Sequence, residues 1–480
     1  MMRQHPHRIT VIGGGAAAAA VVAELLVHGN PRVQVTWFAG HGARGRGVAY
    51  GTRRDEHILN VRAANMGLLD DDTGQFVRFL ADRGWTDVPT AFVPRSLFGD
   101  YIAATLTRLM TDAHERPLVD VRDSEAIALL PREDGGFSVS DDKGGQTDAD
   151  DVVLAIGALP SMPLPQVEES ALRGGRYLTD PWSLQPEQIT PDRVLVIGSR
   201  LTAIDTILTA AQAWPKAKLF ALSRHGCLPG AHTPEPLMPF EQQYAVTEDL
   251  LAARDVRRWF RMVREIVREE NLDWRTLIDG VRPDTNALWQ SLDDTQRGRF
   301  VRHVRWLWDA ARHRMPPQTA HAIDELHQSG RLKVLRGRVQ RIHGEQPTVV
   351  YRQRHGGEIK QIDCDLVIQA TGFESTQEPT RHALVAQMLN TGLTHPDPLG
   401  LGIASNAAGH ALRGDNTPHT HVRVIGVMLR GTLWESASMP EIRVFAGKLA
   451  RDVLNPAAQP EKRNALPAGT ASPQQTVPFR

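Results

Sequence analysis

Near its N-terminus the chain reads ITVIGGGAAAAAVVAELLV (residues 9–27), and a second apolar segment, VQVTWF, follows at residues 33–38. Residues 9–12 are apolar or β-branched and predict a buried parallel strand, residues 16–28 predict an Ala-rich helix, and residues 33–38 predict a second strand. Three glycines fall at the turn between the first strand and the helix. This order of strand, glycine turn, helix and strand is typical of the first βαβ unit of a Rossmann-like domain.

Residues 13–18, GGGAAA, satisfy the dinucleotide-binding fingerprint G-x-G-x-x-G/A between a predicted strand and a predicted helix. Gly13 permits the tight turn, Gly15 lets the backbone approach a pyrophosphate at the helix N-terminus, and Ala18 lets the helix pack closely on the strand. A glycine turn without a ligand is the alternative. The acid that normally follows the second strand and binds ribose is missing, because residues 38–41 read FAGH. We therefore expect His41 or backbone groups to hold the ribose.

The same pattern returns in the middle of the chain. Residues 192–198, DRVLVIG, predict a strand that ends in Gly198, and a helix at 201–214 and a strand at 218–223 follow. Gly198 and Ser199 would form the second glycine turn, but Arg200 stands where the fingerprint has another glycine. The Arg200 side chain could obstruct a dinucleotide or contact one of its phosphates, and a degenerate unit without a ligand is the further alternative.

The end of the second strand in this unit indicates which nicotinamide cofactor it would take. Folds specific for NAD carry an acid there, whereas this chain has Ser223 and Arg224. An arginine suits the 2′-phosphate of NADPH. The sequence therefore favours NADPH over NADH.

A glycine-rich segment, GRGVAYGT, occupies residues 45–52 and is followed by Asn60 and Met66. With Gly47 and Tyr50 it could form a loop folded along an extended cofactor, and the amide of Asn60 could face a heteroaromatic ring. An ordinary glycine-rich surface loop is an equal alternative. Asn60 is the single residue for which we predict a catalytic role, as an amide beside the reacting ring.

Residues 151–157 and 365–372 both read as strands that end in glycine, the second with Thr371 and Gly372. One follows each unit, as expected of crossovers that join paired nucleotide domains. The predicted fold is α/β, with two Rossmann-like domains and the second inserted into the first. We expect strands to begin at Val334 and Val339. The expected boundaries are 1–165 and 370–455 for the first domain, 166–369 for the second with a helical insertion at 247–314, and 456–480 for a disordered tail.

Composition excludes several classes of protein. Of the 480 residues, 55 are basic and 55 acidic, and this zero net charge predicts no nucleic-acid or membrane-surface partner. A mean hydropathy of −0.31 argues against a multi-span membrane protein. Cys227 and Cys364 lie far apart, which fits a reducing cytoplasm and weighs against reductases that relay electrons through neighbouring sulfurs. A signal peptide fits poorly because three glycines and Glu24 interrupt the first apolar run.

Other candidate motifs are weaker. Trp289, Trp306 and Trp308 fall at helical intervals and read mainly as helix packing rather than as an aromatic substrate cage. Arginines at 305, 312 and 314 would permit a carboxylate-bearing substrate, although a solvated basic turn is as good an interpretation. His419 and His421 have no acidic or Cys neighbour that would complete a metal site.

Taken together, several segments resemble the bacterial FAD/NAD(P)-binding oxidoreductases related to flavin-dependent N-hydroxylating monooxygenases. The resemblance covers most of the chain and rests on residues 13–15, 45–51, 57–61, 92–101, 201–205, 223–226, 308 with 312–316, 370–372, and 430–435 with 440–443. It implies FAD in the first domain, with Gly13, Gly15 and Ala18 at its pyrophosphate and with Tyr50, Asn60, Met66 and Arg95 lining the flavin. It also implies that Trp434 and Glu435 begin the last helix near the flavin ring. The chain departs from the family at Ala39 and at Arg200.

The resemblance implies an FAD-dependent, NADPH-consuming monooxygenase that oxygenates a small amine or amino acid with molecular oxygen. NADPH would reduce FAD, oxygen would add to the reduced flavin, and the resulting flavin peroxide would oxygenate the bound substrate. A flavoprotein reductase of a small acceptor or partner protein, and a flavin-binding protein with a degenerate NAD(P) site, are the alternatives. The sequence leaves the substrate and the oligomeric state open.

Overall fold

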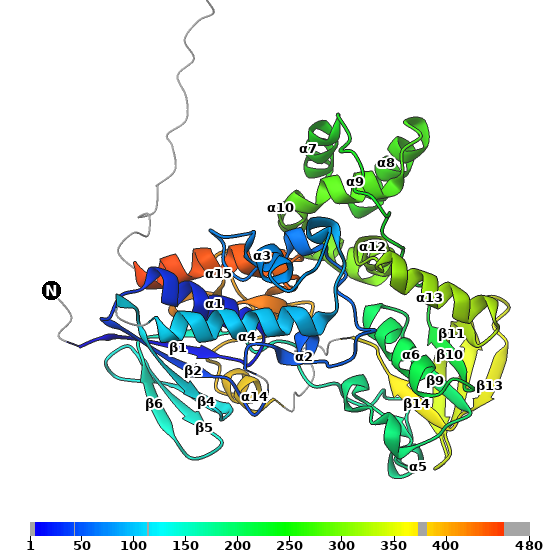
Figure 1. Ribbon diagram of the computed structural model, residues 1–480, viewed down its shortest axis with the longest axis horizontal. Coiled ribbons are helices and arrows are strands. Elements are labelled where there is room, and N and C mark those ends of the chain that lie inside the picture. The colour runs from blue at the N-terminus through cyan, green and yellow to red at the C-terminus, as the bar shows by residue number, and fades with distance from the viewer. Residues whose placement is uncertain (1–4, 43, 113–114, 373–381, 456–480) are drawn as a thin grey trace, which may run out of the picture.

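A computed structural model describes residues 5–42, 44–112, 115–372 and 382–455 of the chain. Two parallel sheets with their helices lie at opposite ends of the molecule, and a group of helices stands above their junction (Figure 1). The tail expected at 456–480 lies outside the described residues. Among the described helices, none is both long and apolar enough to cross a bilayer.

The first sheet has six strands in the order β15-β16-β7-β1-β2-β3. Strand β1 pairs in parallel with β2 and with β7, and β15 is the antiparallel edge strand. All four residues of β7 are buried, as expected of a parallel strand covered on both faces. The strands of this sheet are β1 (His7–Ile12), β2 (Val33–Phe38), β3 (Leu118–Arg122), β7 (Asp151–Leu154), β15 (His410–Leu412) and β16 (Pro418–Val424).

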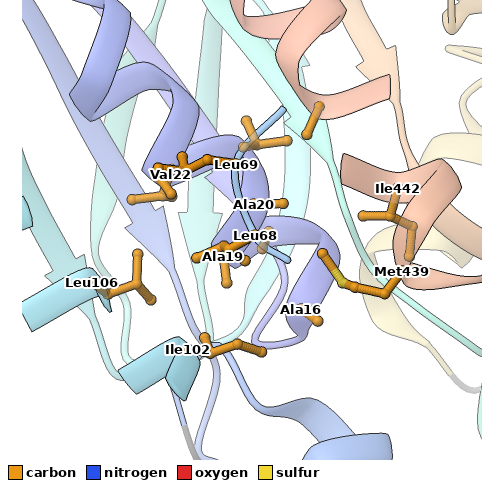
Figure 2. Close-up of a cluster of buried hydrophobic side chains, with 14 of the residues drawn as sticks. Ala16, Ala19, Ala20, Val22, Leu68, Leu69, Ile102, Leu106, Met439 and Ile442 are labelled. Carbon is orange, nitrogen blue, oxygen red and sulfur yellow. The ribbon is translucent and has the colours of Figure 1, made fainter. Parts of the chain in front are cut away.

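Helix α1 (Ala16–His28) is the centre of the main core of this domain. It packs between α4 (Arg95–Thr111) and α15 (Met439–Leu454), and Figure 2 shows Ala19 and Ala20 among Ile102, Leu106 and Ile442. The small side chains of α1 let these helices approach closely, and larger residues there would cost about 1–3 kcal/mol of stability. The fingerprint at the start of α1 is therefore held by a tightly packed helix.

Smaller elements complete the first domain. A separate antiparallel sheet contains β4 (Ala126–Pro131), β5 (Phe137–Asp141) and β6 (Gln146–Ala149). The remaining helices are α2 (Gly47–Tyr50), α3 (Gln75–Ala81) and α14 (Ala383–Asn390), the last of which packs against β4.

The second sheet has seven strands in the order β13-β12-β11-β10-β9-β14-β8. Strands β8 to β11 and β14 pair in parallel, whereas β12 and β13 extend the sheet in antiparallel pairing. Helix α6 (Leu201–Ala213) connects β9 to β10, as the second βαβ unit predicts. The strands are β8 (Tyr177–Leu178), β9 (Arg193–Ile197), β10 (Lys218–Ser223), β11 (Leu332–His343), β12 (Thr348–Gln353), β13 (Ile359–Asp363) and β14 (Leu366–Gln369), and a short helix, α5 (Glu169–Arg173), precedes β8.

One strand prediction is wrong in detail. Val334 and Val339 do not begin two strands, because both belong to the single long strand β11. Its first half, to Arg336, pairs in parallel with β10, and its second half, from Gly337, pairs in antiparallel with β12. The change of partner explains why the sequence pattern reads as two segments.

Most of the chain between β10 and β11 is helical. The helices within residues 243–312 form the helical group, and its first members stand above the junction in Figure 1. Trp289 and Arg282 of this group contact Trp434 and Glu441 of the first domain. The helices are α7 (Gln243–Ala253), α8 (Val256–Glu269), α9 (Trp274–Val281), α10 (Thr285–Ser291), α11 (Asp294–Arg299), α12 (Arg305–Arg312) and α13 (Pro317–Gln328).

Because the chain leaves the first sheet after β7 and returns to it at β15, the second Rossmann-like domain is inserted into the first. The predicted fold class, including the helical insertion, is confirmed.

Candidate functional site

The first glycine turn has the shape that the fingerprint requires. Gly13 has a φ of +136°, and a Cβ there would lie 2.1 Å from the carbonyl oxygen of Ala155 in the neighbouring chain segment. Gly15 has a φ of −99° and stands at the N-cap of α1 without any side-chain cap. The nearest atom to a Cβ at Gly15 would be the Cα of Gly47 at 3.9 Å, an ordinary van der Waals separation, so a Cβ would fit there without a clash. Ala18 is fully buried against the core.

The first N–H groups of α1 have no partner within the helix, and no side chain caps them. A helix N-terminus that follows glycine favours a phosphate or pyrophosphate. The chemistry of these donors fits the pyrophosphate of FAD.

The glycine-rich segment lies directly on this turn. The N–H of Gly47 donates to the carbonyl oxygen of Gly14 at 3.2 Å, and a Cβ at Gly47 would lie 2.8 Å from the Cα of Gly15. Gly47 therefore packs on the first glycine turn, as a loop folded along the same cofactor would require. Tyr50 is half-buried, its ring meets that of Phe98 edge to face at 4.8 Å, and burial raises the pKa of its hydroxyl to about 12.

The other three residues predicted to contact the flavin lie in two different places. The side chain of Met66 is 1 % exposed and belongs to the main core of the first domain. Asn60 is half-buried, and its carbonyl oxygen is 3.0 Å from Nε2 of His232 in the second domain. Arg95 forms an ion pair of 2.9 Å with Asp205 on α6. Asn60 and Arg95 therefore lie at the junction of the two domains, whereas Met66 lies inside the first domain.

A carboxylate that sequence reasoning missed lies beside the end of β2. A Cβ at Gly40 would be 3.9 Å from Oε1 of Glu125, which follows β3 rather than β2. His41, the residue we expected at the ribose, instead places its Nε2 2.6 Å from a carboxylate oxygen of Asp142. The sequence fingerprint looks for an acid directly after β2, so it could not find Glu125, which follows the next strand.

The second glycine turn opens on a groove of about 340 Å³ at the carboxyl ends of β9 and β10. Gly198 has a φ of +141°, and a Cβ there would meet the carbonyl oxygen of Ala370 at 2.2 Å. The groove brings together five of the residues predicted for this site, namely Gly198, Ser199, Ser223, Arg224 and Thr371. Gly372, the sixth, follows Thr371 on the exposed side and has a φ of +95°.

The groove is rich in positive charge. Arg200, Arg224 and Arg338 all line it, and the ring of His225 stacks on Trp306 along its wall. Burial and the neighbouring arginines lower the pKa of His225 to about 4, so the imidazole is neutral at physiological pH. A cluster of guanidinium groups with no carboxylate among the described lining residues suits a phosphorylated ligand.

Arg200 has a partner across this groove. Its guanidinium pairs with Asp309 of α12, whose carboxylate also lies 3.4 Å from Arg305 and 3.5 Å from Arg430. Asp309 is 4 % exposed, and burial lowers the pKa of Arg200 to about 10. Asp309 thus links the second domain, the helical group and the segment after β16.

Trp434 and Glu435 do not begin the last helix, which starts at Met439. Helix α15 starts after Ser438 and has Pro440 in its first turn, where proline is tolerated. The backbone N–H and C=O of Glu435 both form hydrogen bonds with the side-chain amide of Asn286 on α10. These bonds hold Glu435 in the segment before the helix. Trp434 packs on Trp289 with ring centroids 4.8 Å apart.

Arg312 and Arg314 are neither solvated nor free. Arg312 lies 3.4 Å from Glu435, and Arg314 pairs with Asp279, while their exposed fractions are only 6 % and 4 %. Within the described parts of the chain, no group of three or more His, Cys, Asp or Glu side chains could hold a metal ion.

Comparisons with known proteins agree with this geometry. Residues 10–159 match the FAD-NAD(P)-binding family model. The matched segment contains the first glycine turn and the Gly47 loop. No curated protein sequence is significantly similar to the chain.

Solved structures with a fold similar to that of this chain include three amine or amino-acid monooxygenases. The L-lysine 6-monooxygenase of Pseudomonas syringae has a TM-score of 0.64 and 16% identity, covering 95% of this chain and all of its own. The FAD-bound cadaverine monooxygenase of Erwinia amylovora has a TM-score of 0.64 and 12% identity, covering 98% and 100%. The ornithine N-hydroxylase of Kutzneria sp. 744, solved with reduced FAD, NADP+ and L-ornithine, has a TM-score of 0.63 and 16% identity, covering 94% and 100%.

Proposed function

We propose that the protein is an FAD-dependent, NADPH-consuming oxidoreductase that acts as a monooxygenase on a small-molecule amine. The observation that carries the proposal is the pair of glycine turns, each after the first strand of its βαβ unit, at β1 and at β9. The N-terminus of α1 would hold FAD, and the groove lined by Arg200, Arg224 and Arg338 would hold NADPH. The FAD-NAD(P)-binding match and the shared fold support this assignment.

The overall reaction balances with these reactants. The amine R-NH₂, O₂, NADPH and H⁺ would give R-NHOH, NADP⁺ and H₂O: NADPH supplies two electrons, one oxygen atom forms the N–O bond and the other leaves as water. FAD, when bound, supplies the hydride acceptor and the centre that reacts with oxygen. The chain itself contributes binding and orientation through its two turns and excludes water through the apolar side chains at the junction.

The proposal is tested first by the visible spectrum of the purified protein before and after anaerobic addition of NADPH. We expect a flavin spectrum that bleaches with NADPH, followed by incorporation of one ¹⁸O atom from ¹⁸O₂ into the product. A protein that cannot be loaded with FAD would overturn the proposal. Bleaching without oxygen in the product would identify a reductase instead.

A further inference from the structure

The helical group above the junction encloses a cavity of about 570 Å³ that the proposed cofactors do not use. This volume lies in the range of pockets that bind small ligands. Phe300 and Val304, at the two ends of a π-helical turn between α11 and α12, form part of its wall. Such turns are rare and often occur at functional sites. Five of the lining residues are tryptophans, namely Trp259, Trp274, Trp289, Trp308 and Trp434.

The wall of this cavity is almost entirely apolar. Among the described residues that line it, Arg264 is the one charged side chain, and it is exposed at the surface beside Phe260. No Asp or Glu of the described chain lines the cavity. An ammonium group inside it would lose its hydration without gaining a counterion, which is costly.

The cavity adjoins the dinucleotide groove. Cys227 and Ala310 line both spaces, so one wall is shared. Trp434, from the segment after β16, brings the first domain to the same cavity. A ligand here would therefore lie next to the proposed NADPH groove and in contact with the first domain through Trp434.

Three of the indole N–H groups in this wall do not face the cavity. Nε1 of Trp308 and Nε1 of Trp434 are both buried and not exposed to the cavity, and Nε1 of Trp289 donates to the carbonyl oxygen of Gly431. These tryptophans therefore present the apolar parts of their rings to a ligand, which strengthens the apolar character of the wall.

The arginines that would have recognised an amino acid are already paired. Arg305, Arg312 and Arg314 face Asp309, Glu435 and Asp279 respectively. The carboxylate of an amino-acid substrate would have to displace one of these pairs and then enter an apolar space. The cavity is therefore unsuited to a zwitterion.

We infer that the substrate is an apolar amine that enters this cavity in its uncharged form, because the wall offers an apolar surface and no counterion for an ammonium group. This inference rests on the proposed function for the assignment of the amine as substrate. The uncharged form is also the form whose nitrogen lone pair can be oxygenated.

The test is a binding measurement, which does not depend on turnover. Calorimetry on the FAD-loaded full-length protein would use n-butylamine, n-hexylamine and n-octylamine, with L-lysine and 1-octanol as comparators. We expect affinity to rise about fourfold for each added methylene. Octylamine should also bind about tenfold more tightly per pH unit between pH 7 and 9, because its uncharged fraction rises tenfold, whereas 1-octanol should show no pH dependence.

Two variants that fill the cavity provide the structural control. Ala311→Phe, and Val263→Trp as a second variant in case the first does not fold, should each weaken octylamine binding at least tenfold. Ala252→Phe, at an exposed position on α7 outside the cavity wall, should leave it unchanged.

Tighter binding of L-lysine than of octylamine, or equal octylamine binding by folded Ala311→Phe and Val263→Trp, would overturn the inference. Octylamine affinity that does not change with pH would also overturn it, since the charged form would then bind. Failure of NADPH to bleach the flavin would overturn the proposed function alone, because these binding results do not require reduction.

Discussion

The substitution Gly15→Ala separates the folding role of the first glycine turn from its binding role. Gly15 has a φ of −99° and a ψ of −179°, which alanine adopts without strain. The added Cβ would have no protein atom closer than 3.9 Å. The neighbouring substitution Gly13→Ala is the matched control, because its φ is +136° and its Cβ would lie 2.1 Å from the carbonyl oxygen of Ala155.

These distances set the expected magnitudes. Alanine at the N-cap costs about 0.5–1 kcal/mol relative to glycine, and the less flexible unfolded chain returns a similar amount, so Gly15→Ala should change stability by less than about 1 kcal/mol. Gly13→Ala combines backbone strain with a backbone clash and should cost about 3 kcal/mol or more.

Binding of FAD should respond to Gly15→Ala far more strongly than stability does. The new methyl group would stand beside the N–H groups of α1 that a pyrophosphate oxygen would have to reach. Loss of one charge-assisted hydrogen bond, worth about 1.5–3 kcal/mol, corresponds to a rise in Kd of about 10- to 150-fold.

Urea unfolding of the apoprotein and fluorescence titration with FAD measure the two effects separately. An unchanged Kd for FAD in folded Gly15→Ala protein would refute the placement of the pyrophosphate at this turn. Equal destabilisation by Gly15→Ala and Gly13→Ala would refute the turn geometry itself.

Four further predictions concern the groove, the charge centre, protonation and the ribose. Arg224→Ala should raise the Kd for NADPH about tenfold or more and leave that for NADH nearly unchanged, as measured by titration of each nucleotide, because only NADPH has a 2′-phosphate. Asp309→Asn should cost about 3–5 kcal/mol in urea unfolding, because three guanidiniums lose their shared buried carboxylate, and adding Arg305→Met should recover part of the loss. Burial and nearby Arg95 lower the pKa of His57 to about 4, so between pH 4 and 6.5 the unfolded state binds a proton that the folded state does not. The free energy of unfolding should therefore rise with pH through that window, by about 2 kcal/mol, and level off above it. In His57→Asn the pH profile should be flatter by about one proton. Glu125→Ala should weaken FAD binding severalfold in the same fluorescence titration, whereas Glu133→Ala, at an exposed acid on the hairpin between β4 and β5, should not.

Local sequence was sufficient to predict the strands and helices of the two βαβ units. The β2 and β10 segments begin and end at the residues that their apolar patterns predict, and α1 and α6 begin directly after their glycine turns. These features depend on neighbours along the chain, through strand periodicity and through the conformations that glycine alone adopts readily. Gly13 and Gly198 could be assigned for the same reason.

Features set by residues distant in sequence could not be predicted. Glu125 reaches the end of β2 because β3 lies beside it in the sheet, and Glu435 is held outside the last helix by Asn286 of α10, far earlier in the chain. Met66 reads as a flavin contact within its motif, yet the packing of the core buries it. Periodicity carries no information about which side chain a distant element will supply.

Arg200 shows how such a distant partner changes the meaning of a residue. In the sequence it is an obstacle at a glycine position, but in the structure its guanidinium is held by the buried carboxylate of Asp309. Asp309 is shared by three guanidiniums, and so the charge around it remains positive. The same pairing that draws Arg200 towards α12 therefore leaves an electropositive wall at the groove, so a phosphate of NADPH would meet excess positive charge there. On this argument Arg200 would contribute to nucleotide binding at the groove, and its departure from the fingerprint does not by itself indicate a lost site.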